Sequence, residues 1–135
     1  MATREEAVEW VAGYERAWRT PGTDPLADLF TVRATYRAAP YDEPLRGLTA
    51  IAAFWERERE GPDEVFTMDS RIVAVDGDRA VVRVDVWYGN PVAREYRDLW
   101  VIDFAPDGRC EAFEEWPFFP GQPRLAPPGA RHPDS

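Results

Sequence analysis

Apolar residues follow a helical spacing in the first half of the chain and a strand-like alternation in the second half. Over residues 3–19 they recur at intervals of three and four, which predicts an amphipathic helix. The repeating positions are Ala7, Val8, Val11, Tyr14 and Trp18. Thr3 is expected to be the N-cap, with Glu6 at the capping-box position, and Pro21-Gly22 ends the helix.

Two more helices are predicted before the spacing changes. Asp24-Pro25 suits the N-cap and the first position of a short helix that continues through LADLF. A strand at 34–40 and a turn-rich segment follow. The third helix then covers about 49–60, with Thr49 as its N-cap.

From residue 65 onwards, β-branched and aromatic residues alternate with polar ones, as they do in strands. Strands are expected at 65–75, 79–89, 94–104 and 109–119, and the turns DGD and PDG join two pairs of them. Helices followed by a meander of antiparallel strands predict an α+β fold. We expect the three helices to pack on one face of a curved sheet.

The chain has 135 residues, which is the size of one domain. Residues 1–119 contain the predicted helices and strands. Residues 120–135 are dense in proline and hold almost no apolar side chain to bury. We therefore expect one domain over 1–119 and a disordered or loosely draped tail over 120–135.

Charge and hydropathy argue against several classes of partner. The chain has 25 acidic and 16 basic residues, and its net charge of −9 opposes binding to nucleic acid. No apolar run approaches the roughly 20 residues that a membrane helix needs. The opening residues MATREEAVEW lack the apolar segment of a secretory signal, so we expect a cytoplasmic protein.

The residue types available for chemistry are few. Cys110 is the only cysteine and His132 is the only histidine, so neither a disulfide within the chain nor a cysteine–histidine metal site is expected. We expect no metal and no cofactor. Acid–base chemistry would then fall to carboxylates and tyrosines, with arginine as an electrostatic partner.

The strand at 79–89 carries Arg83 and Asp85 two residues apart, so both side chains leave the same face. If that face lines a pocket, Arg83 would keep the Asp85 carboxylate ionised, and Glu115, among aromatic residues, would be desolvated and hold a proton. If the intervening valines face inward instead, Arg83 and Asp85 form a solvated pair that meets arginines of neighbouring strands.

Aromatic and glycine residues keep an order and spacing typical of one protein family. They are Trp10 and Tyr14 to Trp18, LADLF, the block TYRAAPYDEPLRGLTAIAAFW and the ending DGRCEAFEEWPF. Over residues 3–119 they resemble the SnoaL-like branch of the nuclear transport factor 2-like superfamily. The resemblance implies a cone-shaped half-barrel, in which a strongly curved, mainly antiparallel sheet wraps round three helices. It also implies an apolar pocket at one end and a homodimer formed through the outer face of the sheet.

A more distant similarity, to the limonene epoxide hydrolases, concerns the site. In that family an Arg-x-Asp and a second Asp bracket a water, which a Tyr and an Asn help to hold. Arg83-Val84-Asp85, Glu115 and Tyr36 stand at matching positions, whereas Ala38 replaces the Asn. The resemblance implies Asp85 as base, Arg83 as its orienting partner, Glu115 as acid and Tyr36 as hydrogen-bond donor.

Large aromatic rings with a polar edge suit the walls of a pocket for flat apolar ligands. The candidates are Tyr14, Trp18, Trp55, Trp87, Trp100 and Trp116. Asp98 and Asp103 lie on opposite faces of their strand, so one of them must face outward. The sequence thus predicts a protein that binds a small apolar or amphipathic molecule. It leaves open cofactor-free acid–base catalysis of the isomerase, cyclase or epoxide hydrolase type, or a non-catalytic ligand-binding or protein-interaction module.

Overall fold

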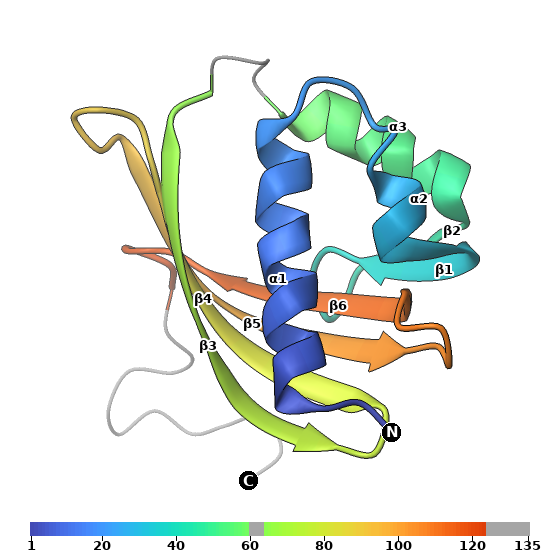
Figure 1. Cartoon of the computed structure of the whole chain (residues 1–135). Helices are drawn as coiled ribbons and strands as arrows, with labels where there is room; N and C mark the ends of the chain where they lie inside the picture. The colour runs from blue at the N-terminus through green and yellow to red at the C-terminus, as the bar shows by residue number, and fades with distance from the viewer. Residues whose placement is uncertain (60–63, 124–135) are drawn as a thin grey trace, which may run out of the picture.

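The computed structural model describes residues 1–59 and 64–123, and within them the chain forms three helices and six strands (Figure 1). In chain order they are α1 (Arg4–Arg19), α2 (Leu26–Leu29), β1 (Phe30–Arg37), β2 (Leu45–Arg46), α3 (Leu48–Glu58), β3 (Phe66–Asp76), β4 (Arg79–Tyr88), β5 (Arg94–Phe104) and β6 (Cys110–Phe118). The change from helical to strand-like spacing is therefore confirmed, and the chain is an α+β protein.

All six strands belong to one sheet, in the order β2-β1-β6-β5-β4-β3. The long strands β3 to β6 form the predicted antiparallel meander. The first strand, β1, instead runs parallel to β6, so the sheet is mixed. This pairing places Tyr36 and Arg37, at the end of β1, beside Phe113 and Glu114 in the middle of β6, although the two strands are far apart in the chain.

The ends of the helices follow local chemistry. Thr3 caps α1 as predicted, because its hydroxyl oxygen accepts the backbone N–H of Glu6 at 3.1 Å. The predicted N-cap of the third helix, Thr49, is wrong by two residues. Gly47 takes that position with a φ of 93°, and its N–H donates to the carbonyl of Ala34 at 2.8 Å. The helix therefore begins directly where the chain leaves the sheet.

The short second helix is also less extensive than expected. It comprises Leu26–Leu29 with Pro25 as its N-cap, and strand β1 begins at Phe30. Phe30 is fully buried and its ring packs edge-on against Trp10 of α1, at 5.5 Å between ring centres. Tertiary packing therefore decides where this helix ends.

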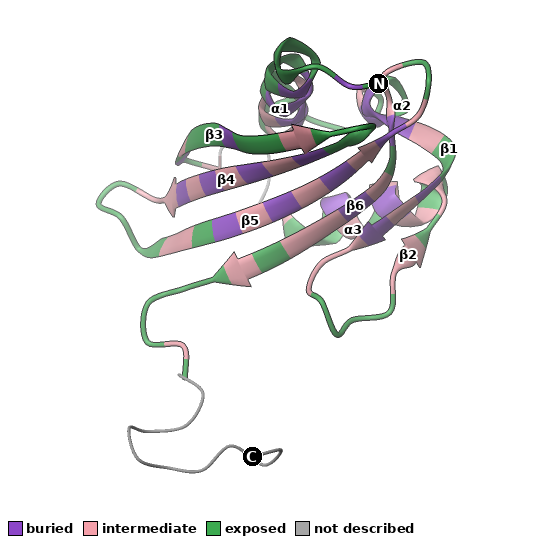
Figure 2. Ribbon diagram, turned by 90° about the horizontal axis from the view of Figure 1, so that it is seen from below, coloured by how far each residue is buried: buried purple, intermediate pink, exposed green. Residues whose placement is uncertain are grey.

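The core lies between the helices and one face of the sheet. Buried and less buried residues alternate along β4 and β5, as the stripes in Figure 2 show. On β4 the buried residues are the alternate Ala80, Val82, Val84 and Val86, which belong to the core. Helix α1 closes this core with Trp10 and Tyr14.

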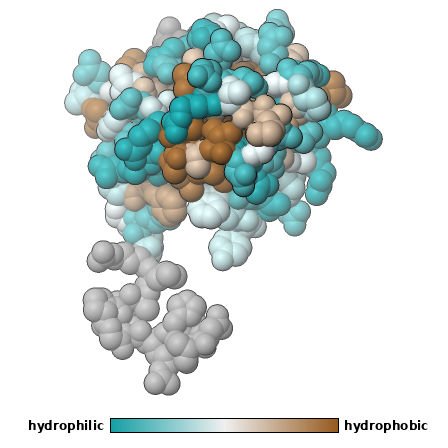
Figure 3. Space-filling view, turned by 60° about the horizontal axis from the view of Figure 1, so that its bottom comes forward, coloured by the Kyte–Doolittle hydropathy of each residue, from teal (hydrophilic) through white to brown (hydrophobic). Residues whose placement is uncertain are grey.

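The opposite face of the sheet is polar with an apolar patch. The face that comes forward in Figure 3 shows hydrophobic side chains bordered by hydrophilic ones. Strands β5 and β6 turn Leu99, Val101, Trp116 and Phe118 toward this side, and the Phe118 side chain is 51% exposed. The expected pairing of two copies through this face stays a prediction.

Two other expectations concern the ends of the chain and its surroundings. The tail predicted at 120–135 falls largely on residues 124–135, which lie outside the described residues. None of the helices among the described residues has both the length and the apolar character needed to cross a membrane.

Adjacent residues of β5 offer a test of which face is the core. Ile102 is fully buried, whereas its neighbour Val101 turns to the outer face and is only half-buried. Replacing Ile102 by Ala should lower the free energy of unfolding by about 2–5 kcal/mol, because it leaves a cavity in the core. Val101→Ala should cost less than about 1 kcal/mol in the same denaturant titration. Equal losses would contradict the assignment of the two faces.

Candidate active site

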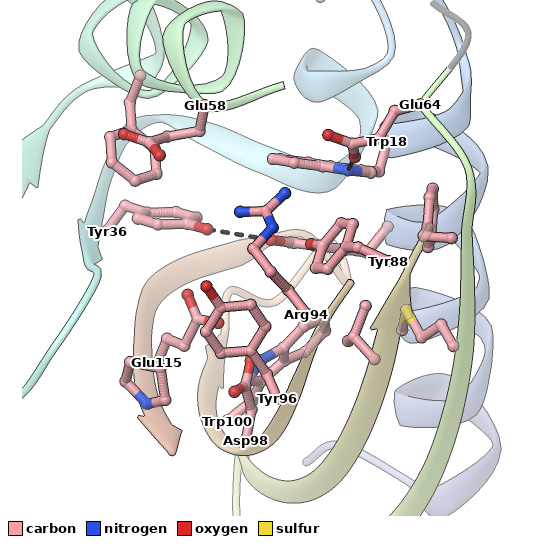
Figure 4. A pocket seen from close by; sticks show the side chains of 16 residues that line it. Trp18, Tyr36, Glu58, Glu64, Tyr88, Arg94, Tyr96, Asp98, Trp100 and Glu115 are labelled. Atoms are coloured by element: carbon pink, nitrogen blue, oxygen red, sulfur yellow. Dashed lines mark hydrogen bonds between the residues drawn. The ribbon is translucent and has the colours of Figure 1, made fainter. Parts of the chain in front are cut away.

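A cavity of about 210 Å³ lies between α1, α3 and the inward face of the sheet (Figure 4). Its aromatic lining residues are Tyr14, Trp18, Tyr36, Phe54, Phe66, Tyr88, Tyr96 and Trp100. Its ionisable lining residues other than the tyrosines are the acidic Glu58, Glu64, Asp98 and Glu115 and the basic Arg94. Glu58 and Arg94 are exposed, whereas Asp98 is only 4% exposed. We therefore call the end near Glu58 the outer end and the end near Asp98 the inner end.

The pairing of β5 with β6 brings two carboxyl groups together at the inner end. Trp100 stands opposite Glu115, and Asp98 precedes Trp100 by two residues, so all three side chains leave the same face. Diagonal neighbours on antiparallel strands lie within reach of long side chains. The indole N–H of Trp100 donates to Oδ2 of Asp98 at 3.4 Å.

The carboxyl groups of Asp98 and Glu115 interact, so the ionisation of each depends on the state of the other. Burial is the main reason why the pKa of Glu115 lies well above its ordinary value of 4.5, and the neighbouring Asp98 raises it further. Burial also raises the pKa of Asp98, but hydrogen bonds from Glu115 and Trp100 act against that rise. Asp98 is therefore the group that ionises first, and Glu115 keeps the proton.

A pair of tyrosine hydroxyls lies in the same cavity. Tyr14 of α1 and Tyr36 of β1 are buried, and their hydroxyl oxygens are 3.0 Å apart, as the dashed line in Figure 4 marks. Burial raises the pKa of both phenols well above 10.0, so both stay protonated. One hydroxyl donates to the other, and the proton of the second is not used in that bond. The pair can thus offer a hydrogen bond to an oxygen of a ligand.

The outer end combines charges with aromatic rings. The indole N–H of Trp18 donates to Oε1 of Glu64 at 2.7 Å. The guanidinium carbon of Arg94 lies 4.9 Å from the ring centre of Tyr88. Figure 4 shows the guanidinium of Arg94 directed toward the end where Glu58, Trp18 and Glu64 lie.

The structure brings two of the four predicted catalytic residues to this cavity. Tyr36 and Glu115 line it. Arg83 and Asp85 do not, because the inward positions of β4 are taken by the valines between them. They pair with each other on the outer face, with Arg83 Nε 3.2 Å from Asp85 Oδ1 and 40% and 27% of the two side chains exposed. The expected pocket placement of Arg83 and Asp85 is therefore corrected to the solvated alternative.

The six predicted aromatic ligand contacts divide evenly. Tyr14, Trp18 and Trp100 line the cavity. Trp55 is fully buried behind it, and Trp87 and Trp116 lie on the outer face of the sheet. The indole N–H of Trp116 donates there to Oε2 of Glu114 at 2.7 Å.

Asp98 is the main residue that the sequence did not identify as part of the site. The signal was present in β5, where the alternate residues Tyr96, Trp100, Ile102 and Phe104 form an aromatic and apolar face. Asp98 is the one acidic residue in that series. Its counterpart Asp103 faces outward and accepts a hydrogen bond from Arg79 at 2.6 Å.

The described residues contain no group of three or more histidine, cysteine, aspartate or glutamate side chains placed to hold a metal ion. Cys110 is buried in the core, and burial raises the pKa of its thiol. The carboxyl pair and the tyrosine hydroxyls that line the cavity suit proton transfer by carboxyl groups, with hydroxyl groups as hydrogen-bond donors.

A comparison of the amino-acid sequence with known protein families identifies the family of this chain. The SnoaL-like domain matches residues 11–113, so the chain belongs to the SnoaL-like family and with it to the nuclear transport factor 2-like superfamily. None of the curated proteins matches the chain in sequence.

Solved structures share the fold at low identity. The epoxide hydrolase/cyclase-like enzyme SalBIII, described in pyran ring formation in the polyether salinomycin, is 18% identical, with 87% of this chain and 95% of that chain covered and a TM-score of 0.70. A proposed polyketide cyclase from Sinorhizobium meliloti is 23% identical, with 79% and 93% covered and a TM-score of 0.62. A proposed ketosteroid isomerase from Kribbella flavida is 19% identical, with 91% and 84% covered and a TM-score of 0.63. These similarities show the fold.

The carboxyl pair should make folding depend on pH. Because burial raises the pKa of Glu115, the folded protein binds its proton more tightly than the unfolded chain does. This contribution to stability is complete below the ordinary glutamate value of 4.5 and is lost as the pH rises through the folded pKa.

Glu115→Gln should therefore raise the free energy of unfolding by about 1 kcal/mol at mildly alkaline pH. Below the ordinary pKa of 4.5, where the carboxyl is protonated in both states, the gain should disappear. Urea titrations at the two pH values measure the difference. A gain that is larger at acidic pH would contradict the direction of the shift.

Proposed function

We propose that this chain is an isomerase or cyclase that moves a proton on a small carbonyl compound held in the cavity, without a cofactor. The observation that carries the proposal is the carboxyl pair at the inner end. Asp98 ionises first and can accept a proton, whereas Glu115 holds a proton and can donate it. Two carboxyl groups in one buried site can thus take opposite roles.

In the proposed reaction, Asp98 removes a proton from the carbon next to the carbonyl. The electrons of the broken C–H bond move into the carbon skeleton, and negative charge develops on the carbonyl oxygen. The hydroxyl pair of Tyr14 and Tyr36 donates a hydrogen bond to that oxygen, which stabilises it best when the charge is greatest.

This intermediate can react in two ways, and in each of them every proton and electron pair is accounted for. In an isomerase, a proton returns to a different carbon, from Glu115 or from Asp98 itself. In a cyclase, the carbon attacks a second carbonyl within the same molecule, and Glu115 protonates the oxygen of that carbonyl. Both outcomes need the same base and hydroxyl donors, and the cyclase also needs Glu115 as its acid.

Family membership and the cavity itself support this class of reaction. The fold is shared with proteins whose names include a proposed polyketide cyclase and a proposed ketosteroid isomerase. In the cone-shaped half-barrel that the resemblance implies, the cavity would be the apolar pocket. Its volume of about 210 Å³ lies below the roughly 300 Å³ of the smaller ligand sites in proteins, so we propose a substrate of one or two rings.

The exchange of carbon-bound hydrogen tests the proposal without knowledge of the substrate. We propose 2-tetralone as the probe, in deuterated water, with loss of its α-proton signals followed by NMR. Asp98→Asn should slow the exchange catalysed by the protein about 10²–10⁴-fold, because it removes the base. Tyr36→Phe should slow it less, since Tyr14 keeps its hydroxyl.

Asp85→Asn is the matched control, because it makes the same chemical change on the outer face of the neighbouring strand. It should leave the exchange unchanged. Exchange that survives Asp98→Asn would contradict the assignment of the base. Binding of 2-tetralone without any exchange in the unaltered protein would favour a non-catalytic ligand-binding module.

The rate of exchange should rise with pH, and a reaction that also uses Glu115 as its acid should have a bell-shaped dependence on pH. The rate should rise as Asp98 loses its proton, with a midpoint above the ordinary aspartate value of 3.8 because burial raises the pKa of this group. For a reaction that also needs an acid, the rate should fall at higher pH as Glu115 ionises. The falling limb should be absent in Glu115→Gln, and its persistence there would exclude Glu115 as the acid.

A further inference from the structure

We infer that the ligand of this cavity carries a protonated amine on a compact apolar body, and that its ammonium group lies at the outer end, between Glu58 and Glu64. The inference names the chemical class of the substrate and rests on the proposed function in that both use the same cavity. Three features of the residues that line the cavity support the inference: a buried oxygen without a hydrogen-bond donor, an excess of negative charge, and aromatic rings that pack against cations.

The first observation is an unfilled acceptor that marks the cavity as a ligand site. Asp98 lines the cavity and is 4% exposed, and its Oδ1 accepts no hydrogen bond from any of the described residues. Within the described part of the chain, the indole N–H of Trp100 donates to the other oxygen of this carboxyl group, Oδ2, and leaves Oδ1 unserved. A buried acceptor without enough donors is costly, and a bound molecule can satisfy it.

The second observation is the balance of charge. Four acidic side chains line the cavity, and Arg94 is the one basic side chain among the described residues that line it. With one proton on the inner carboxyl pair, three negative charges and one positive charge remain. A carboxylate or phosphate on the ligand would add to this excess, whereas an ammonium group would reduce it.

The third observation is that the aromatic rings of the lining already pack against cations. The guanidinium carbon of Arg94 is 4.9 Å from the ring centre of Tyr88, and that of Arg19 is 3.8 Å from the ring centre of Phe66. The Trp18 ring lies beside Glu64, to which its indole N–H donates. Ring faces next to carboxylates form a favourable site for an ammonium group.

The test compares three probes that share a phenyl ring and differ in their polar end. They are 2-phenylethylamine, 2-phenylethanol and 3-phenylpropanoate, which are cationic, neutral and anionic at neutral pH. The indole N–H signals of Trp18 and Trp100 in ¹⁵N-resolved NMR spectra report binding at the two ends of the cavity. We expect the amine to bind about fivefold or more tighter than the alcohol, and the carboxylate to bind weakest.

Charge variants locate the ammonium group. Glu58→Gln combined with Glu64→Gln should remove most of the preference for the amine, and the amide oxygen introduced at position 64 can still accept the Trp18 hydrogen bond. Arg94→Gln should have the opposite effect and tighten the amine. Glu111→Gln, an equal change of charge at an exposed residue of β6 that does not line the cavity, is the control and should change nothing.

The preference should also shrink at high salt, because exposed charges are screened. Equal binding of amine and alcohol, tighter binding of the carboxylate, or no indole shift with the amine up to its solubility limit would each overturn the inference. If the exchange reaction needs Asp98 but the amine is not preferred, this inference alone fails. If the amine is preferred but Asp98→Asn leaves exchange intact, the proposed function alone fails.

Discussion

Two carboxyl groups face one cavity, and burial together with their interaction raises the pKa of Glu115 well above its ordinary value. Several parts of the fold produce this constraint. The register of β5 with β6 sets Asp98 diagonally from Glu115, and Trp100 between them supplies the one indole N–H. Helix α1 covers the site and adds the Tyr14 hydroxyl. The proposed base, acid and hydroxyl donors all follow from this single arrangement.

The parallel pairing of β1 with β6 is the second requirement of the site. It places Tyr36 next to Phe113, with ring centres 4.6 Å apart, and so brings the hydroxyl of Tyr36 to that of Tyr14. A sheet built only as an antiparallel meander would leave β1 elsewhere. The site therefore depends on contacts between the first and the last strands of the chain.

The sequence predicts helices and long strands well, because their period is a local property of the chain. It predicts the site only in part. It points to Glu115 and Tyr36, but it leaves open whether Arg83 and Asp85 or the alternate valines of β4 face the interior. Which of the two alternating sets of side chains on a strand faces the core depends on the cost of burying each set. Burying valines is favourable, whereas burying Arg83 and Asp85 is costly, so the valines face the core. In β5 the same rule turns Asp98 inward, because the residues on its side of the strand, such as Trp100 and Ile102, are aromatic or apolar. The parallel pairing of β1 has no local signal.

The most direct test of the account is a ¹³C NMR titration of the carboxyl carbons of Asp98 and Glu115. The account predicts that Glu115 keeps its proton well above the ordinary value of 4.5 and that Asp98 titrates before it, above 3.8. It also predicts that Asp98→Asn lowers the pKa of Glu115, because the neighbouring charge is lost. Titration of both groups near 3.8 and 4.5, unaffected by the other's replacement, would contradict the shared proton on which the proposed chemistry depends.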